Sequence, residues 1–171
     1  MELASWRLPR IYVAATFDDG VDVQFMCSRA AELLLSQTVH WWEHEGPNVD
    51  EKFGRIDADG VKSADFFAMY HSGKRSAGKY IEMGIAIALG KPIFTFGEDL
   101  TTVFRCFVDR HFHHDVFDPE KAAEQLYVAI SEIYAIRGRC MLCGDKIHFW
   151  QRKTGRGSKH SKCKKKLRKC N

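Results

Sequence analysis

The segment DFFAMYHSGKRSAGKYIEMGIAIALGKPIFTF, residues 65–96, determines the expected fold. Its first seven residues form an apolar, aromatic run typical of a buried strand, and the polar stretch 72–77 follows as a loop. Residues 78–89 repeat apolar side chains at helical spacing and end at Gly90, a residue typical of helix C-termini. Residues 92–96 form a second apolar run. The segment therefore predicts a strand–helix–strand unit with parallel strands.

The same alternation continues on both sides of this unit. Further strands are expected at residues 10–16, 38–43 and 114–117, and further helices at 21–37, 50–63 and 118–136. The last helix is expected to begin at Asp118-Pro119, with Asp as N-cap and Pro in the first turn. This order predicts the α/β class, with a doubly wound, flavodoxin-like five-stranded parallel sheet. Ligands of such sheets bind beyond the carboxyl ends of the strands.

Charge divides the chain into two parts. Residues 137–171 contain 13 of the 26 Lys and Arg but one of the 22 Asp and Glu, a net charge of +12. Residues 1–136 contain the remaining 13 basic and 21 acidic residues and have a net charge of −8, so the whole chain has a net charge of +4. We therefore expect a domain over residues 1–136 and a basic module over residues 137–171.

The sequence has no feature that predicts a membrane or secretory destination. No apolar run reaches the about 18 residues of a membrane-spanning helix. The first ten residues, MELASWRLPR, lack the basic stretch and apolar core of a signal peptide. We therefore expect a cytoplasmic protein with no membrane partner.

Four of the six cysteines lie in the basic module, where they predict a structural zinc site. The expected ligands form two pairs at C-x2-C and H-x2-C spacing: Cys140, Cys143, His160 and Cys163. His148 and Cys170 compete with these, so the fourth ligand stays open. A segment this short has too little core to fold unaided, and zinc would stabilise it. The alternative is a reduced basic tail without metal.

The basic side chains of the same module favour binding to nucleic acid. Lys and Arg neutralise phosphates, and the neighbouring Phe149 and Trp150 could stack on unpaired bases. The alternative is a solvated charge run that raises solubility.

Two acidic residues of the body are candidates for chemistry. Glu82 lies near the start of the helix 78–89, on its apolar side, where the helix N-terminus favours the ionised form and apolar surroundings make it nucleophilic. An acid at this place can also simply stabilise the helix. Asp57 lies on the preceding helix, and Asp59 points away from it. Both aspartates could instead be surface acids.

Three stretches together resemble the nucleoside 2-deoxyribosyltransferase family, which includes the 2′-deoxynucleoside 5′-phosphate N-hydrolases. They are YVAATFDDG (12–20), DADGVKSAD (57–65) and SAGKYIEMGIAIALGKPI (76–93). The resemblance covers about residues 10–135. It implies an enzyme that cleaves or transfers the N-glycosidic bond of a 2′-deoxynucleoside or its 5′-monophosphate, without a catalytic cofactor.

The resemblance also implies roles for catalytic residues. Glu82 matches the nucleophile, which attacks C1′ of the deoxyribosyl group and forms a covalent intermediate, as in a retaining glycosidase. Asp57 matches the aspartate that contacts the base and assists its protonation. Tyr12 matches a tyrosine near the nucleophile, although a strand tyrosine is as often core.

Five residues are candidates for binding the substrate: Phe17, Asp19, Ser76, Gly78 and Trp42. The resemblance implies that Gly78 lets the backbone approach the sugar. Ser76 matches the nucleotide hydrolases, in which a hydroxyl binds the 5′-phosphate. The loop with Asp18 and Asp19 resembles the transferases instead, and its charges disfavour phosphate, so the 5′ group stays open.

Aromatic side chains offer a surface for the base. Phe17, Trp41 or Trp42 could stack on it, while alternation along a strand would turn one Trp into the core.

The family also implies a homo-oligomer, although the chain continues beyond the usual terminus. Two other functions remain open: a nucleotide-sensing module that binds nucleic acid without catalysis, and an NAD-cleaving enzyme.

Overall fold

The computed structural model describes residues 8–43, 51–74, 76–100 and 102–136. The chain divides into two compact units, Pro9–Leu126 and a second one made of Met1–Leu8 and Tyr127–Asn171. The first unit contains the sheet described below. The expected zinc and nucleic-acid module, residues 137–171, lies outside the described residues.

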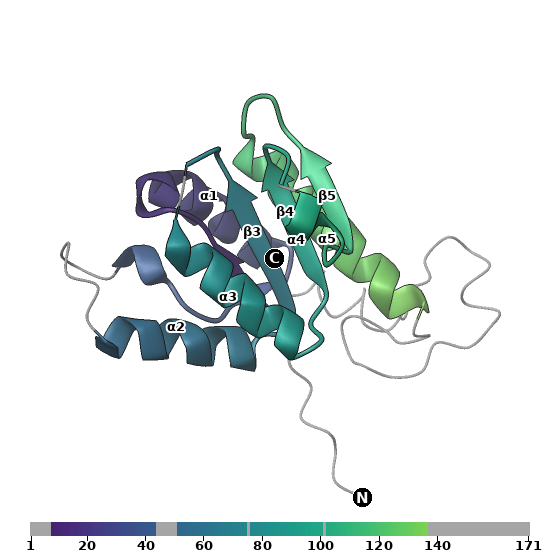
Figure 1. Cartoon of the computed structure of the whole chain (residues 1–171). Coiled ribbons are helices and arrows are strands. Elements are labelled where there is room, and N and C mark those ends of the chain that lie inside the picture. Colours follow the sequence, from purple (N-terminus) through teal and green to yellow (C-terminus); the bar gives the residue numbers. More distant parts are fainter. Residues whose placement is uncertain (1–7, 44–50, 75, 101, 137–171) are drawn as a thin grey trace, which may run out of the picture. The chain divides into compact units, whose positions relative to one another are not determined.

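The described residues form a five-stranded parallel sheet with helices between the strands (Figure 1). The strands are β1 (Arg10–Ala14), β2 (Ser36–Gln37), β3 (Phe66–His71), β4 (Ile93–Gly97) and β5 (Arg110–His113). The helices are α1 (Gly20–Glu32), α2 (Glu51–Ser63), α3 (Ala77–Ala88), α4 (Thr102–Arg105) and α5 (Pro119–Ile136), with short 3-10 helices η1 (Phe17–Asp19) and η2 (Trp41–Glu43). The order β2-β1-β3-β4-β5 confirms the expected doubly wound, flavodoxin-like fold.

The central strands are apolar because both faces of the sheet are covered. All of Phe66–Tyr70 in β3 and all of β4 are buried, as is typical of parallel strands between two helix layers. α2 and α3 lie side by side on one face (Figure 1). On the other face, Arg29 of α1 forms an ion pair of 3.1 Å with Glu124 of α5.

The first helix ends earlier than expected, at Glu32 instead of residue 37. Leu34 has a φ of +67°, and the N–H groups of Leu34 and Leu35 donate to the carbonyls of Ala31 and Ala30. These bonds form a Schellman motif, which usually has glycine at the left-handed position. Because leucine occupies that position, the sequence did not mark the end of the helix.

Two expected strands were wrong. Residues 38–43 do not form a strand: β2 is shorter and comes earlier, and Trp41–Glu43 form η2. Residues 114–117 do not form a strand either, because β5 comprises Arg110–His113. Both β2 and β5 are short edge strands without the apolar pattern of a buried strand, so the sequence-based expectation favoured the more apolar neighbours.

The remaining helix boundaries agree with the sequence. α3 ends in a Schellman motif with Gly90 at φ +62°, and the backbone N–H of Lys121 donates to Asp118 Oδ1 at 3.0 Å, which confirms the expected N-cap of α5. Among the described residues, the helices are all too short or too polar to cross a membrane.

Candidate active site

The strand order reverses between β1 and β3, which is where ligands of doubly wound sheets bind. The loop after β1 contains η1, and the loop after β3 leads through Ser72–Lys74 towards α3. Asp19 connects the two loops. One of its carboxylate oxygens accepts hydrogen bonds from Thr16 Oγ1 at 2.5 Å and Ser72 Oγ at 2.6 Å, and the other accepts one from Lys74 Nζ at 3.2 Å.

The Asp19 carboxylate is buried and ionised. Burial alone would raise its pKa, but the hydrogen bonds from Ser72, Thr16 and Lys74 outweigh this and lower the pKa below its usual range. Both oxygens of Asp19 are therefore occupied by protein donors. The neighbouring Asp18 is exposed and lies 3.8 Å from the same Lys74 ammonium group.

Tyr12, Asp57 and Glu82 come together between β1, α2 and α3. Tyr12 is fully buried, one carboxylate oxygen of Asp57 is fully buried, and Glu82 is half-buried. The Tyr12 hydroxyl is near enough to both carboxylates for hydrogen bonding to affect the pKa values of Tyr12 and Glu82. The Tyr12 hydroxyl is thus in close polar contact with the two carboxylates without a formed hydrogen bond among the described residues. The fold thus brings together the three expected catalytic residues.

Burial dominates the electrostatics of this cluster. It raises the pKa of Glu82 from 4.5 to about 7; the Tyr12 hydroxyl lowers this pKa and the nearby Asp57 charge raises it. Burial also raises the pKa of Tyr12 far above its usual range, and the Glu82 and Asp57 charges add to that rise. A carboxyl group with a pKa near 7 can act at neutral pH both as a nucleophile and as a proton carrier.

Gly60 is a residue that the sequence analysis missed. It lies on α2, where an added Cβ would overlap Val39 and lie 3.0 Å from the Tyr12 ring. Only glycine lets α2 approach β1 this closely, which places Asp57 of α2 near Tyr12. The sequence indicated such close packing only through a glycine within a helical pattern.

Lys79 was also missed. It is buried, with 1% of its surface exposed, and its Nζ donates to the Lys74 carbonyl at 2.8 Å and lies 3.1 Å from His71 Nδ1. Burial lowers the pKa of Lys79, and Asp19 opposes this change. Burial also lowers the pKa of His71, and the Lys79 charge lowers it further. A lysine in the first turn of a helix opposes the helix dipole. This unfavourable position was the one indication in the sequence that Lys79 has a special role.

Ser76 and Gly78 lie at the start of α3. Ser76 is the N-cap residue, yet its side chain makes no capping hydrogen bond. Gly78 is exposed, and an added Cβ would approach Ser76 Oγ alone, at 3.7 Å. This end of α3 therefore has open space and a hydroxyl that is not used for capping, beside backbone N–H groups that favour anions.

The three aromatic candidates differ in exposure. Trp41 is buried and its Nε1 donates to the Val13 carbonyl at 2.6 Å, so the inward Trp is core. Trp42 is half-buried and stacks on His40, and Phe17 is 59% exposed with its ring edge-on to Trp41. Phe17 begins η1, shortly after the carboxyl end of β1, and its exposed surface is available to a ligand.

Comparison with known proteins supports the fold. The CMP N-glycosidase BcmB from Clostridium botulinum is 18% identical over 68% of this chain and 97% of its own, with a TM-score of 0.52. BlsM, known from a solution structure, is 18% identical over 76% of this chain and 93% of its own, with a TM-score of 0.58. Similarity at this level shows a shared fold. No protein-family model and no curated protein matches the chain.

Proposed function

We propose that this protein cleaves the N-glycosidic bond of 2′-deoxynucleoside 5′-monophosphates through a covalent intermediate on Glu82. The observation that supports it best is the position of the half-buried Glu82 beside Tyr12 and Asp57, where burial raises its pKa to about 7. Two carboxyl groups in one site are what a retaining glycosidase uses. One of the similar structures is described as a CMP N-glycosidase, which fits this class of reaction.

The proposed reaction has two steps. A Glu82 oxygen attacks C1′, the C1′–N bond breaks, and the base leaves with a proton supplied by Asp57 or by water. Water then attacks C1′ of the glycosyl ester and gives one proton to Asp57 or to solvent, and the C1′–O bond to Glu82 breaks, which releases the sugar phosphate and restores the Glu82 carboxylate. Tyr12 orients the Glu82 carboxylate and is a positioning residue. Gly78 leaves room for the sugar at the start of α3.

The surroundings of α3 support a 5′-phosphate. The charge of Asp19 is compensated by Lys74 and two hydroxyl groups, so it repels a phosphate less than the sequence suggested. Ser76 offers a hydroxyl, and the buried Lys79 adds a positive charge near the helix N-terminus. Phe17 and Trp42 remain the candidates for stacking on the base.

The experiment measures free base released from a panel of compounds by the purified full-length protein. The panel contains the four deoxynucleoside monophosphates, CMP, the deoxynucleosides and NAD. We expect release from deoxynucleotides, loss of release in Glu82→Gln, and normal release in the control Asp59→Asn, which removes an exposed acid that pairs with Lys62. Release from no compound would refute the proposal.

Two further measurements examine the mechanism. A quenched reaction should show a protein mass increased by the sugar phosphate in the wild type and not in Glu82→Gln. Adding a second free base distinguishes transfer from hydrolysis, because only a transferase would form a new nucleotide. Full activity of Glu82→Gln would overturn the mechanism even if base is released.

We also propose, from the sequence, that residues 137–171 bind one structural zinc ion and nucleic acid. Metal analysis and salt-dependent binding to a DNA fragment test this, with Cys140→Ser as the variant.

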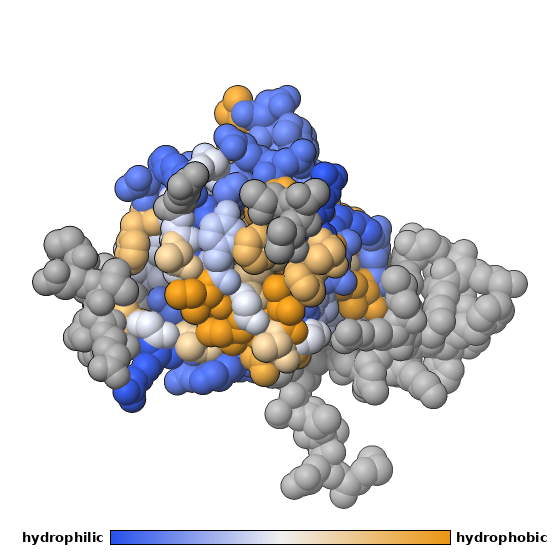
Figure 2. Space-filling model, in the orientation of Figure 1, coloured by the Kyte–Doolittle hydropathy of each residue, from blue (hydrophilic) through white to orange (hydrophobic). Residues whose placement is uncertain are grey.

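A homo-oligomer is proposed as well, to be measured by light scattering. Ile81 of α3 and Leu89, the C-cap residue of this helix, are exposed. Figure 2 shows an apolar patch on the surface, which such an assembly would cover.

A further inference from the structure

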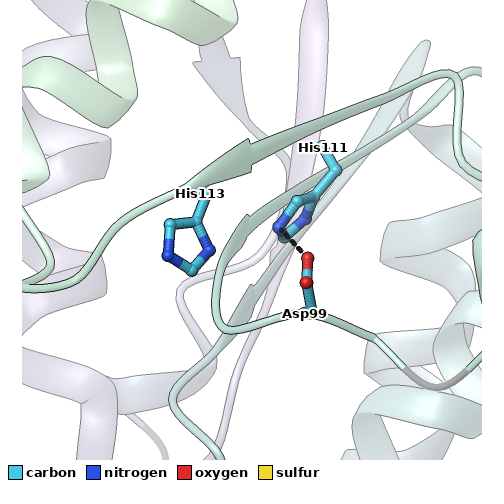
Figure 3. A group of neighbouring side chains, drawn as sticks. All are labelled: Asp99, His111 and His113. Carbon is cyan, nitrogen blue, oxygen red and sulfur yellow. Dashed lines mark ion pairs between the residues drawn. The ribbon is translucent and has the colours of Figure 1, made fainter.

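A group of metal-ligating side chains lies at the edge of the sheet, on β5 and the loop after β4. His111 and His113 are two residues apart on β5 and are paired in register with Thr95 and Gly97 of β4. Residues two apart on a strand share a face, so both imidazoles lie on one side. Asp99 follows Gly97 by two residues, and its carboxylate faces His111, with His113 next to this pair (Figure 3).

The distances suit a single small cation. One ligand atom of each of the three residues lies within 4.8 Å of the other two. His111 Nε2 lies 3.2 Å from Asp99 Oδ1. In a tetrahedral zinc site with bonds of about 2.0–2.1 Å, neighbouring ligand atoms are about 3.3 Å apart. The His111–Asp99 pair already has this spacing, and a ligand atom of His113, whose side chain is exposed, lies within 4.8 Å of both.

His111 has the surroundings of a metal ligand. Its Nδ1 lies 2.8 Å from the hydroxyl of Thr95, which is fully buried, so the ring orientation is held from behind. Its Nε2 is buried and faces Asp99 Oδ1 at 3.2 Å without forming a hydrogen bond within the described residues. A hydrogen bond to one ring nitrogen that aims the other at the ion is the usual arrangement around protein-bound metals.

The simpler explanation is an ordinary surface ion pair. Asp99 is 64% exposed, and His113 Nε2 lies 3.1 Å from Asp115, which is 95% exposed. Such exposed pairs contribute little stability. The Asp99 pair supplies a polar partner for the buried His111 Nε2, but it does not account for the second imidazole, His113, within 4.8 Å of the other two ligand atoms.

We propose that Asp99, His111 and His113 bind a divalent transition metal ion of the zinc class, with Thr95 orienting His111. Two imidazoles and one carboxylate match the ligands of zinc sites that keep a further coordination position for water. The ion would join the edge strand β5 to the loop after β4. Its ligands are different residues from those expected for the zinc site in residues 137–171 and from those of the Tyr12–Asp57–Glu82 cluster.

Zinc content measured in zinc-buffered solution tests the proposal. Full-length protein is equilibrated at controlled free zinc concentrations, and bound zinc per chain is determined in wild type, His111→Gln, His113→Gln and the control His40→Gln. All four proteins share the same tail, so any zinc bound there cancels in the comparison. We expect wild type and His40→Gln to hold one more zinc per chain than the other two variants.

A second variant and a second measurement keep the test independent of folding defects. Thr95→Val retains all three ligands but loses the orienting hydroxyl, and we expect zinc to bind about 10- to 100-fold more weakly.

Free zinc at 100 times its dissociation constant should raise the Tm of the wild type by about 5–10 °C, and this rise should be smaller in His111→Gln. Far-ultraviolet circular dichroism without zinc verifies that the variants fold. Equal zinc content in all folded variants, with equal Tm shifts, would overturn the proposal.

Discussion

Replacing Glu82 by glutamine should stabilise the folded protein at neutral and alkaline pH while removing its proposed nucleophile. Burial raises the pKa of Glu82 from 4.5 to about 7. Between these values the folded protein therefore binds more protons than the unfolded chain. By proton linkage, the free energy of unfolding falls as pH rises through this interval. The ionised glutamate is thus a cost to stability that is fully present above pH 7 and absent below pH 4.5.

The size of this cost follows from the two pKa values. At about 1.4 kcal/mol for each tenfold change, the rise from 4.5 to about 7 corresponds to about 3 kcal/mol. Glutamine has a similar shape and does not ionise, so Glu82→Gln avoids the cost. We expect the variant to match the wild type near pH 4.5 and to exceed it by about 3 kcal/mol at pH 8.

Urea unfolding measured in steps between pH 4.5 and 8 provides the assay. The four tryptophans of the chain supply a fluorescence change, and circular dichroism verifies that both probes report one transition. Asp59→Asn, which removes an exposed acid on α2, is the control and should follow the wild type at every pH. A difference between Glu82→Gln and wild type that does not change with pH would refute the reasoning.

Three more predictions concern the same unit. In urea unfolding, Gly60→Ala should lower the free energy of unfolding by about 1–3 kcal/mol, because the added Cβ overlaps Val39. The control Gly54→Ala, which has open space around the added Cβ, should raise the free energy of unfolding by up to about 1 kcal/mol. Asp19→Asn should cost about 2–3 kcal/mol at pH 7, and the loss should shrink as acid protonates the wild-type carboxylate, whose pKa is lowered. The kcat/KM for base release should rise with pH through about 7, as Glu82 ionises. Tyr12→Phe should move this rise to higher pH, because the Tyr12 hydroxyl lowers the pKa of Glu82. A pH-independent kcat/KM would contradict this prediction.

The periodic apolar patterns predicted the central part of the fold because they result from burial. β1, β3 and β4 lie under helices on both faces, so their sequences are nearly continuous apolar runs. Patterning failed at the edges. β5 has a partly exposed sequence, Arg-His-Phe-His, that resembles a loop, and β2 comprises two residues, Ser36 and Gln37.

The sequence alone determined the α/β class, the strand–helix alternation, the charge boundary at residue 137 and the candidate acids. The tertiary structure decided which of these residues meet. Glu82, Asp57 and Tyr12 come from three elements, and their proximity depends on Gly60 letting α2 approach β1. Likewise, Asp99 and His111 become neighbours because β4 and β5 pair in a particular register. Local patterns record whether a residue is buried, whereas distances between residues far apart in the chain depend on packing.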